Sequence, residues 1–254
     1  MKILFSICFS LLCSFGFAQN SVENNTQKGN LINSVFYEEL PITNLDDLKD
    51  IPKQYQEMIK TSKQIPKYYE LLFNGSEALY KKEEKKRENP EDLNTGNMQM
   101  KETVIKFGGI AEMYKNFKTK TSVSSRTILD KEFLVSENLQ KINWELINET
   151  KTIGSIDCRK AQAKIGGDLI EAWYAPGIPT MAGPSIYWGL PGLIVEVRNK
   201  TQHYLAIQIK ENIAGTITIP TKGEKINPQE FQKKVIQHAE DYKKTMPPMT
   251  FGRN

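Results

Sequence analysis

The chain has 254 residues, a formal net charge of +4 and three cysteines. A chain of this length can bury a core without a metal or disulfides to hold it together. Basic and acidic residues are mixed even in the densest charged run, residues 81–88, so the small positive excess does not indicate nucleic acid as a partner.

The N-terminus has the layout of a secretory signal peptide. Lys2 supplies a positive charge, residues 3–17 are mostly apolar, and Gly16 and Ala18 place small residues before a cleavage site. The apolar run is shorter than the roughly 20 residues that a membrane-spanning helix needs, and a polar stretch follows it, so we expect cleavage rather than a retained anchor. We therefore predict a signal peptide over residues 1–18 and a single exported domain over residues 19–254, with no membrane span after cleavage.

Cleavage removes two of the three cysteines, Cys8 and Cys13. Only Cys158 remains, so the mature chain is expected to have no intramolecular disulfide, although an exported protein could form one. We expect the lone thiol to be a small buried hydrophobic group on a strand.

The first elements in chain order are a strand over residues 31–40 and two short helices. Asn44 is placed to cap the first helix, and Pro52 opens the second. Residues 68–73 and 76–82 then read as a hairpin around Asn74-Gly75, a dipeptide typical of tight turns between strands.

Short strands at regular spacing follow, and a helix closes the chain. Asn227 is the expected helix cap, with Pro228 at the first helical position and Glu230 completing a capping-box spacing. The fold class predicted is mainly β: a curved antiparallel sheet or half-barrel with a C-terminal helix and a short N-terminal helical insertion. The later strands are expected at residues 103–107, 113–117, 121–130, 133–136, 142–146, 155–165, 169–174, 193–198, 203–209 and 216–219.

A proline- and glycine-rich stretch carries the most specific pattern. Ala172-Trp173-Tyr174 precedes it, and its last six residues, 189–194, read GLPGLI. Together with Ile142-Asn143-Trp144 and residues 153–161, this pattern resembles the GLPGLI family of exported proteins of Gram-negative bacteria. The resemblance covers residues 100–215 approximately. It implies export and a β-rich fold, and no particular chemistry.

The GLPGLI residues themselves suit a turn that launches a strand. Pro191 fixes the second position of a type II turn, and Gly192 tolerates the positive φ of the third. Gly189 lets the backbone pass close to a bulky neighbour. We predict Gly189, Pro191 and Gly192 to be structural.

Aromatic residues gather around this loop. A stiff aromatic loop either fills a core or forms the rim of a ligand site, and aromatic residues beside turns more often pack than bind. If they bind, they would line a concave apolar surface. The candidate binding residues are Trp144, Trp173, Tyr174, Tyr187 and Trp188.

No catalytic constellation is recognisable. The only histidines, His203 and His238, are far apart in sequence, and no metal-ligand spacing accompanies them. A Cys158–His203 pair could be imagined, but no nucleophile signature surrounds Cys158. We predict no catalytic residue, no metal, no cofactor and no enzymatic activity.

Three functional hypotheses remain. The first is a non-enzymatic binding module of the cell envelope, located in the periplasm, at the outer membrane or outside the cell, which takes an apolar ligand or peptide. The second is an interaction or structural component that docks on an outer-membrane or other envelope protein without a small ligand. The third, and least favoured, is a thiol-dependent enzyme.

Overall fold

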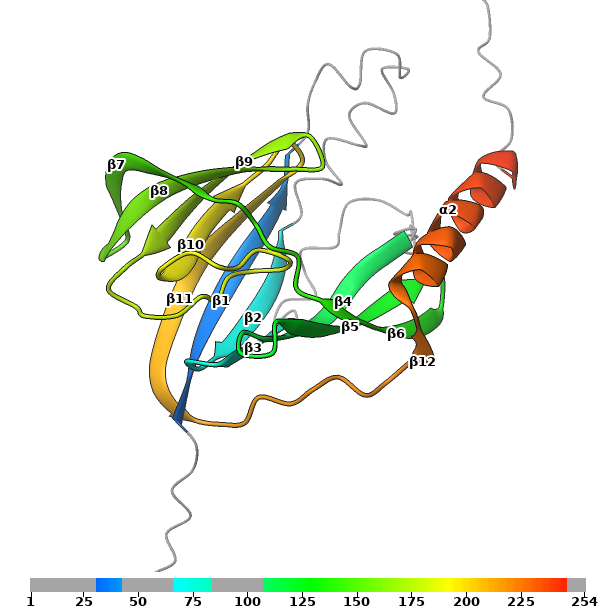
Figure 1. Ribbon diagram of the computed structural model, residues 1–254, viewed down its shortest axis with the longest axis horizontal. Coiled ribbons are helices and arrows are strands. Elements are labelled where there is room, and N and C mark those ends of the chain that lie inside the picture. Colours follow the sequence, from blue (N-terminus) through cyan, green and yellow to red (C-terminus); the bar gives the residue numbers. More distant parts are fainter. Residues whose placement is uncertain (1–30, 43–65, 84–106, 246–254) are drawn as a thin grey trace, which may run out of the picture.

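The computed structural model describes residues 31–42, 66–83 and 107–245 (Figure 1). The expected signal peptide and the two short helices expected after Asn44 lie outside the described residues. Within these ranges, no helix combines the length and hydropathy that crossing a bilayer requires.

The described residues form one large β-sheet and one helix, α2 (Pro228–Thr245), which confirms the predicted fold class. All neighbouring strands are antiparallel except β12 and β6, which are parallel. The strands are β1 (Leu31–Pro41), β2 (Lys67–Phe73), β3 (Glu77–Lys82), β4 (Phe107–Asn116), β5 (Thr121–Ile128), β6 (Lys131–Asn138), β7 (Glu145–Ile153), β8 (Ile156–Ile165), β9 (Asp168–Ala175), β10 (Leu193–Arg198), β11 (Gln202–Ala214) and β12 (Glu224–Ile226).

The sheet consists of two meanders that meet at β1. Strands β2 to β6 pair in sequence on one side, strands β11 to β7 pair in sequence on the other, and β1 lies between β2 and β11. The outermost strands are β12 and β7. Figure 1 shows the first meander beside α2 and the second at the opposite end of the molecule.

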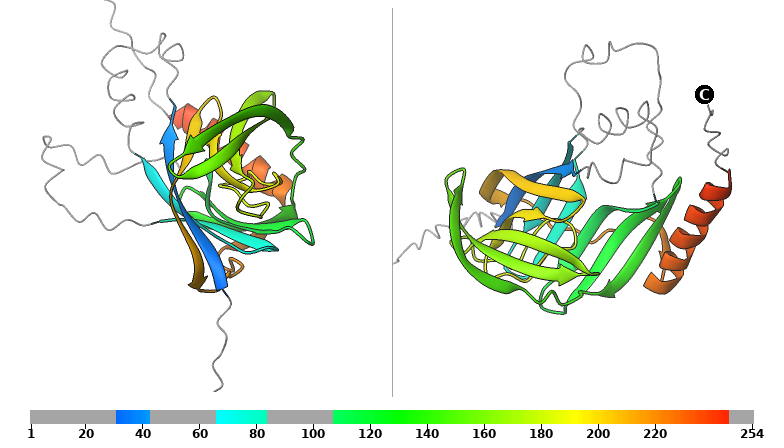
Figure 2. Two further views of the ribbon diagram at one scale, coloured as in Figure 1. Left: turned by 90° about the vertical axis from the view of Figure 1, so that its left-hand side faces the viewer. Right: turned by 90° about the horizontal axis from the view of Figure 1, so that it is seen from above.

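The sheet curves around the segment that joins β9 to β10, residues 176–192, which we call the plug loop (Figure 2, left). Apolar residues of the loop, among them Ala182, Tyr187 and Leu190, are buried in the same core as residues of β1, β2, β9 and β10. The plug loop therefore fills the concave side of the second meander, as expected for a loop in which aromatic residues pack.

Local sequence signals account for the best-predicted elements. In the β2–β3 hairpin, the Asn74 side-chain oxygen accepts hydrogen bonds from the backbone N–H groups of Ser76 and Glu77. At α2, the Asn227 side chain accepts a hydrogen bond from the N–H of Glu230 at 2.8 Å, so the predicted cap is confirmed. Phe231 then anchors the helix in a second, smaller core on β5 and β6.

Two expected strands are wrong. Residues 216–219 form no strand, because the chain there crosses from β11 to the far edge of the sheet, where β12 begins at Glu224. Ile142 and Trp144 precede β7 instead of lying in it. They belong to an extended segment, residues 139–144, which we call the linker and which is held by side-chain contacts described below.

Candidate binding groove

A groove of about 460 Å³ lies on the concave side of the sheet, between the first meander and the plug loop. Its floor comes from strands β4 to β6, which contribute Met113, Arg126 and Glu137, among others. Its walls are the linker, the β8–β9 turn, and the residues Ile186 and Trp188 of the plug loop. This volume is in the range of small-molecule and short-peptide sites.

Two tryptophans tie the linker to the plug loop. The Trp144 indole N–H donates to the Trp188 carbonyl oxygen at 2.9 Å, and the Trp188 indole N–H donates to the Gln140 carbonyl oxygen at 2.9 Å. The Trp188 ring also stacks on Phe117 of the sheet floor, with 6.0 Å between ring centroids. The two walls of the groove therefore form one connected unit.

A second, shallower hollow of about 360 Å³ lies on the other side of the linker. It shares residues 141–143 with the groove and is also lined by Trp144, Gly189 and Pro191. The linker is thus the partition between two neighbouring hollows.

The floor of the groove carries an ion pair that is held from several sides. The Arg126 guanidinium contacts the Glu137 carboxylate at 2.7 Å and donates to the Ser124 hydroxyl at 2.9 Å. It also lies 5.5 Å from the centroid of the Phe231 ring on α2. These contacts fix the orientation of the guanidinium and link the groove floor to the helix.

Lys115 on β4 is buried beneath the plug loop. Its ammonium group donates hydrogen bonds to the carbonyl oxygens of Gly183, Ser185 and Tyr187 at 2.7, 2.7 and 3.1 Å. Burial lowers the pKa of Lys115 to about 7, whereas hydrogen bonds from the ammonium group to three carbonyl dipoles favour the charged form. Nothing in the sequence analysis identified this residue.

Gly192 has the positive φ expected of it, but the close approach expected at Gly189 is wrong. A Cβ added at Gly189 would meet nothing within 4 Å, and the close approach is at Gly192, where it would lie 2.2 Å from the Ala175 carbonyl oxygen. Gly189 and Gly192 both have positive φ, 94° and 154°. However, the Leu190 carbonyl accepts a hydrogen bond from the N–H of Gly192, and the N–H of Leu193 donates to Ile178. The expected type II turn is therefore wrong. A tighter three-residue turn centred on Pro191 takes its place, because the Leu193 N–H is already bound to the Ile178 carbonyl oxygen and does not close a four-residue turn.

All five predicted binding residues lie in or against the main core, and only two of them line a hollow. Trp188 lines the groove and Trp144 the second hollow. Tyr174 and Tyr187 are buried in the main core, where Asn199 donates to the Tyr187 hydroxyl at 2.8 Å. Trp173 points to the opposite face of the sheet from Tyr174, its neighbour in β9.

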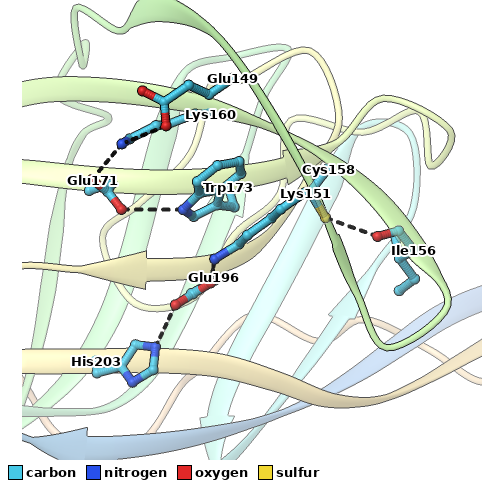
Figure 3. A network of polar contacts seen from close by, with 9 residues as sticks. All are labelled: Glu149, Lys151, Ile156, Cys158, Lys160, Glu171, Trp173, Glu196 and His203. Atoms are coloured by element: carbon cyan, nitrogen blue, oxygen red, sulfur yellow. Dashed lines mark hydrogen bonds and ion pairs between the residues drawn. The ribbon is translucent and has the colours of Figure 1, made fainter.

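Trp173 lies in a polar network on that outer face (Figure 3). The Lys151 ammonium lies 4.2 Å from the centroid of the Trp173 ring and pairs with Glu196, which also contacts His203 at 2.8 Å. The Lys160 ammonium, 5.6 Å from the same ring, pairs with Glu149 and Glu171 at 3.1 Å each. Charged side chains thus cover the indole, and Trp173 lines neither the groove nor the second hollow.

The imagined Cys158–His203 pair is not assembled. Glu196 and Lys151 lie between the two side chains, and the Cys158 thiol contacts the Ile156 carbonyl at 3.5 Å (Figure 3). Burial raises the pKa of Cys158 to about 11, which leaves almost no thiolate near neutral pH. The hydrogen bond from His203 and the nearby Lys151 instead hold the pKa of Glu196 at about 2.

Within the described ranges, no three or more His, Cys, Asp and Glu side chains are grouped so that they could hold a metal ion. What the groove offers chemically is an apolar wall, several side-chain amides and four charged groups.

Comparison with known proteins gives a family for this fold. The family described as "N-glycanase peptide, N-terminal domain" matches residues 98–229, more than half of the chain. The chain belongs to this family. The match is independent of the GLPGLI resemblance, which stays a prediction.

The solved structures agree with the fold. Two crystal forms of PNGF-II resemble the chain with TM-scores of 0.54 and 0.53, each at 14% sequence identity and over 82% of this chain. The chain spans only about a third of the length of these proteins, 34% and 33%. No curated protein matches the sequence.

Sequence reasoning missed the groove because its lining comes from segments far apart in the chain. One signal was available. Met113, Lys115 and Phe117 alternate along β4 and the residue that follows it, so a lysine occupies an inward-facing position between two apolar residues. A buried lysine needs partners, and such a position marks a contact that the rest of the chain must supply.

Proposed function

We propose that this chain is an exported, non-enzymatic binding module whose groove holds an extended peptide with apolar side chains. The observation that carries the proposal is the groove itself, whose lining combines the apolar groups of Met113, Ile186 and Trp188 with side-chain amides that are able to pair with a peptide backbone. Such a combination is typical of sites that recognise short peptides.

Amide side chains along the linker favour a peptide over an acyl chain. Asn138, Gln140 and Asn143 all line the groove. Side-chain amides both donate and accept hydrogen bonds and can therefore pair with the N–H and carbonyl groups of a bound strand. An acyl chain would leave these groups without partners at a cost.

The charged side chains of the groove favour a peptide that carries an acidic residue. Arg126 is neutralised by Glu137, whereas Lys141 and Lys164 have no carboxylate opposite them among the lining residues. The surplus is positive, so a peptide with an acidic residue near its apolar side chains fits best. This attraction weakens with added salt.

The family membership supports a polypeptide as the bound partner. The family is named for an N-glycanase, and about two thirds of the chain in the PNGF-II structures lies outside the part that matches this module. We infer that the module contributes binding and that any chemistry on the bound partner occurs elsewhere. The buried, protonated Cys158 thiol supports a role without catalysis.

A phage-displayed library of eight-residue peptides, panned on the purified protein, tests the proposal. We expect enrichment of sequences that combine apolar and acidic residues. Ile186→Glu, which places a charge in the groove wall, should abolish retention of the enriched peptides. Ile207→Glu is the matched control, because Ile207 is an exposed isoleucine outside the groove.

Failure has two distinguishable forms. If no sequence is enriched, the groove does not bind peptides and the proposal fails. If enriched peptides bind the Ile186→Glu variant as well as the original chain, the protein binds them elsewhere. That second result would favour the alternative of an interaction protein that docks through another surface.

A further inference from the structure

Lys115 is unusual because no carboxylate among the described residues pairs with its charge. Its side chain is fully buried, and its ammonium group donates hydrogen bonds to three backbone carbonyl oxygens of the plug loop. Its strand neighbours, Ala78 on β3 and Ser122 on β5, are uncharged. A buried ammonium group is costly unless each of its donors finds an acceptor.

The carbonyl groups come from alternate residues of one tight turn. Gly183, Ser185 and Tyr187 contribute them, and the N–H of Tyr187 donates back to Pro184 at 3.0 Å. Ser185 has a φ of 49°, a conformation that non-glycine residues rarely adopt. The turn is therefore held in a strained shape with its carbonyl groups directed at one point.

The same turn supplies a wall of the groove. Ile186 lies between two of the residues that bind Lys115, and Trp188 follows the third. A shift of these carbonyl groups away from β4 would carry both groove residues with it.

We propose that Lys115 is the positioning residue of the groove: its ammonium group gathers the three carbonyl groups and thereby sets Ile186 and Trp188 as the groove wall. Lysine suits this task because an ammonium group has three donors and no acceptor, which matches three converging carbonyl oxygens. The effect of Lys115 on ligand affinity rests on the proposed function, whereas its effect on the conformation of the plug loop does not.

Lys115→Met tests the proposal, because methionine fills the space and removes every donor. The matched control is Lys118→Met, an exposed lysine close by in the β4–β5 turn. Two readouts are compared: hydrogen exchange of the Tyr187 and Gly189 amides, and the affinity for the apolar probe N-phenyl-1-naphthylamine. We expect Lys115→Met to raise both exchange rates and the probe Kd at least tenfold, and the control to change neither.

A second variant separates positioning from general damage. Lys115→Ala leaves a space that propylammonium can occupy, whereas propanol has a similar size and no charge. We expect propylammonium to restore slow exchange at Tyr187 and Gly189, and propanol to have no effect. Equal effects of the two compounds, or slow exchange in both variants without any addition, would overturn the proposal.

The outcomes also separate this proposal from the proposed function. If the original chain binds neither probe nor peptide, the groove function fails, and the exchange rates alone decide the role of Lys115. If the original chain binds the probe and Lys115→Met binds it equally well despite a loosened loop, Lys115 does not position the groove.

Discussion

Trp144 in the linker and Trp188 in the plug loop each donate a hydrogen bond to a backbone carbonyl group of the other segment. The Trp144 indole donates to the Trp188 carbonyl, and the Trp188 indole donates to Gln140 in the linker that carries Trp144. The two hydrogen bonds therefore fix the linker against the plug loop. The linker, in turn, separates the groove from the second hollow.

Replacing Trp144 by phenylalanine should loosen this connection. Phenylalanine keeps most of the apolar contact but has no N–H donor, so the Trp188 carbonyl loses its partner. We expect the free energy of unfolding in urea to fall by about 1 kcal/mol. Leu146→Ala at an exposed position of β7 is the control, with an expected change below about 0.5 kcal/mol. Equal losses in the two variants would show that the indole hydrogen bond contributes nothing.

The two glycines of the predicted turn should respond differently to alanine. At Gly192 an added Cβ would lie 2.2 Å from the Ala175 carbonyl oxygen, whereas at Gly189 it would meet open space. Gly189→Ala carries only the cost of its positive φ, about 1–3 kcal/mol. Gly192→Ala adds a backbone clash, so we expect a clearly larger loss in a urea titration, or no soluble protein. A Gly192→Ala variant as stable as Gly189→Ala would contradict the packing described here.

Glu196 should make stability depend on pH in the acid range. Its pKa in the folded protein is about 2, below the roughly 4.3 of an unfolded glutamate. The unfolded chain thus binds the proton more tightly, and the stabilisation by Glu196 is present above pH 4–5 approximately and is lost as the pH falls toward 2. The difference in unfolding free energy between the original chain and Glu196→Gln should therefore shrink between pH 5 and pH 2 approximately. A difference that stays constant over this range would show that the carboxylate is not selectively stabilised.

Cys158 should behave as an inert thiol. Its raised pKa reduces the thiolate fraction about a hundredfold relative to an exposed cysteine, and burial further limits access. We expect iodoacetamide at pH 8 to modify the native protein at least a hundredfold more slowly than the urea-unfolded chain. Cys158→Ala should leave binding of enriched peptides unchanged. Rapid labelling of the native protein would restore the hypothesis of a thiol-dependent enzyme.

The features predicted well from the sequence are local ones. Asn74 and Asn227 act on backbone groups within three residues, so their roles can be recognised without knowledge of the fold. Alternation of apolar residues located most strands for the same reason, since the period of a strand is visible in a short window.

The features that were missed depend on distant partners. Ile142 and Trp144 have the alternation of a strand, yet none of the described strands pairs with them, and Trp144 is held by a residue 44 positions away. Lys115 binds carbonyl groups about 70 residues further along the chain. Trp173 and Trp188 look alike in sequence, but strand alternation places Trp173 on the face away from the plug loop. Alternation separates Trp173 from Tyr174 in β9, but the curvature of the sheet determines which of the two faces meets the plug loop.

A hydrogen-exchange footprint of a bound peptide tests the central claim most directly. Exchange would be measured on the original chain with and without a saturating peptide from the library. We predict protection confined to the groove, in the linker, at the end of β8 and the start of the β8–β9 turn (residues 164–166), and around Ile186 and Trp188. Protection along the edge strand β7 or over the outer-face network at Trp173, with none in the groove, would contradict the account.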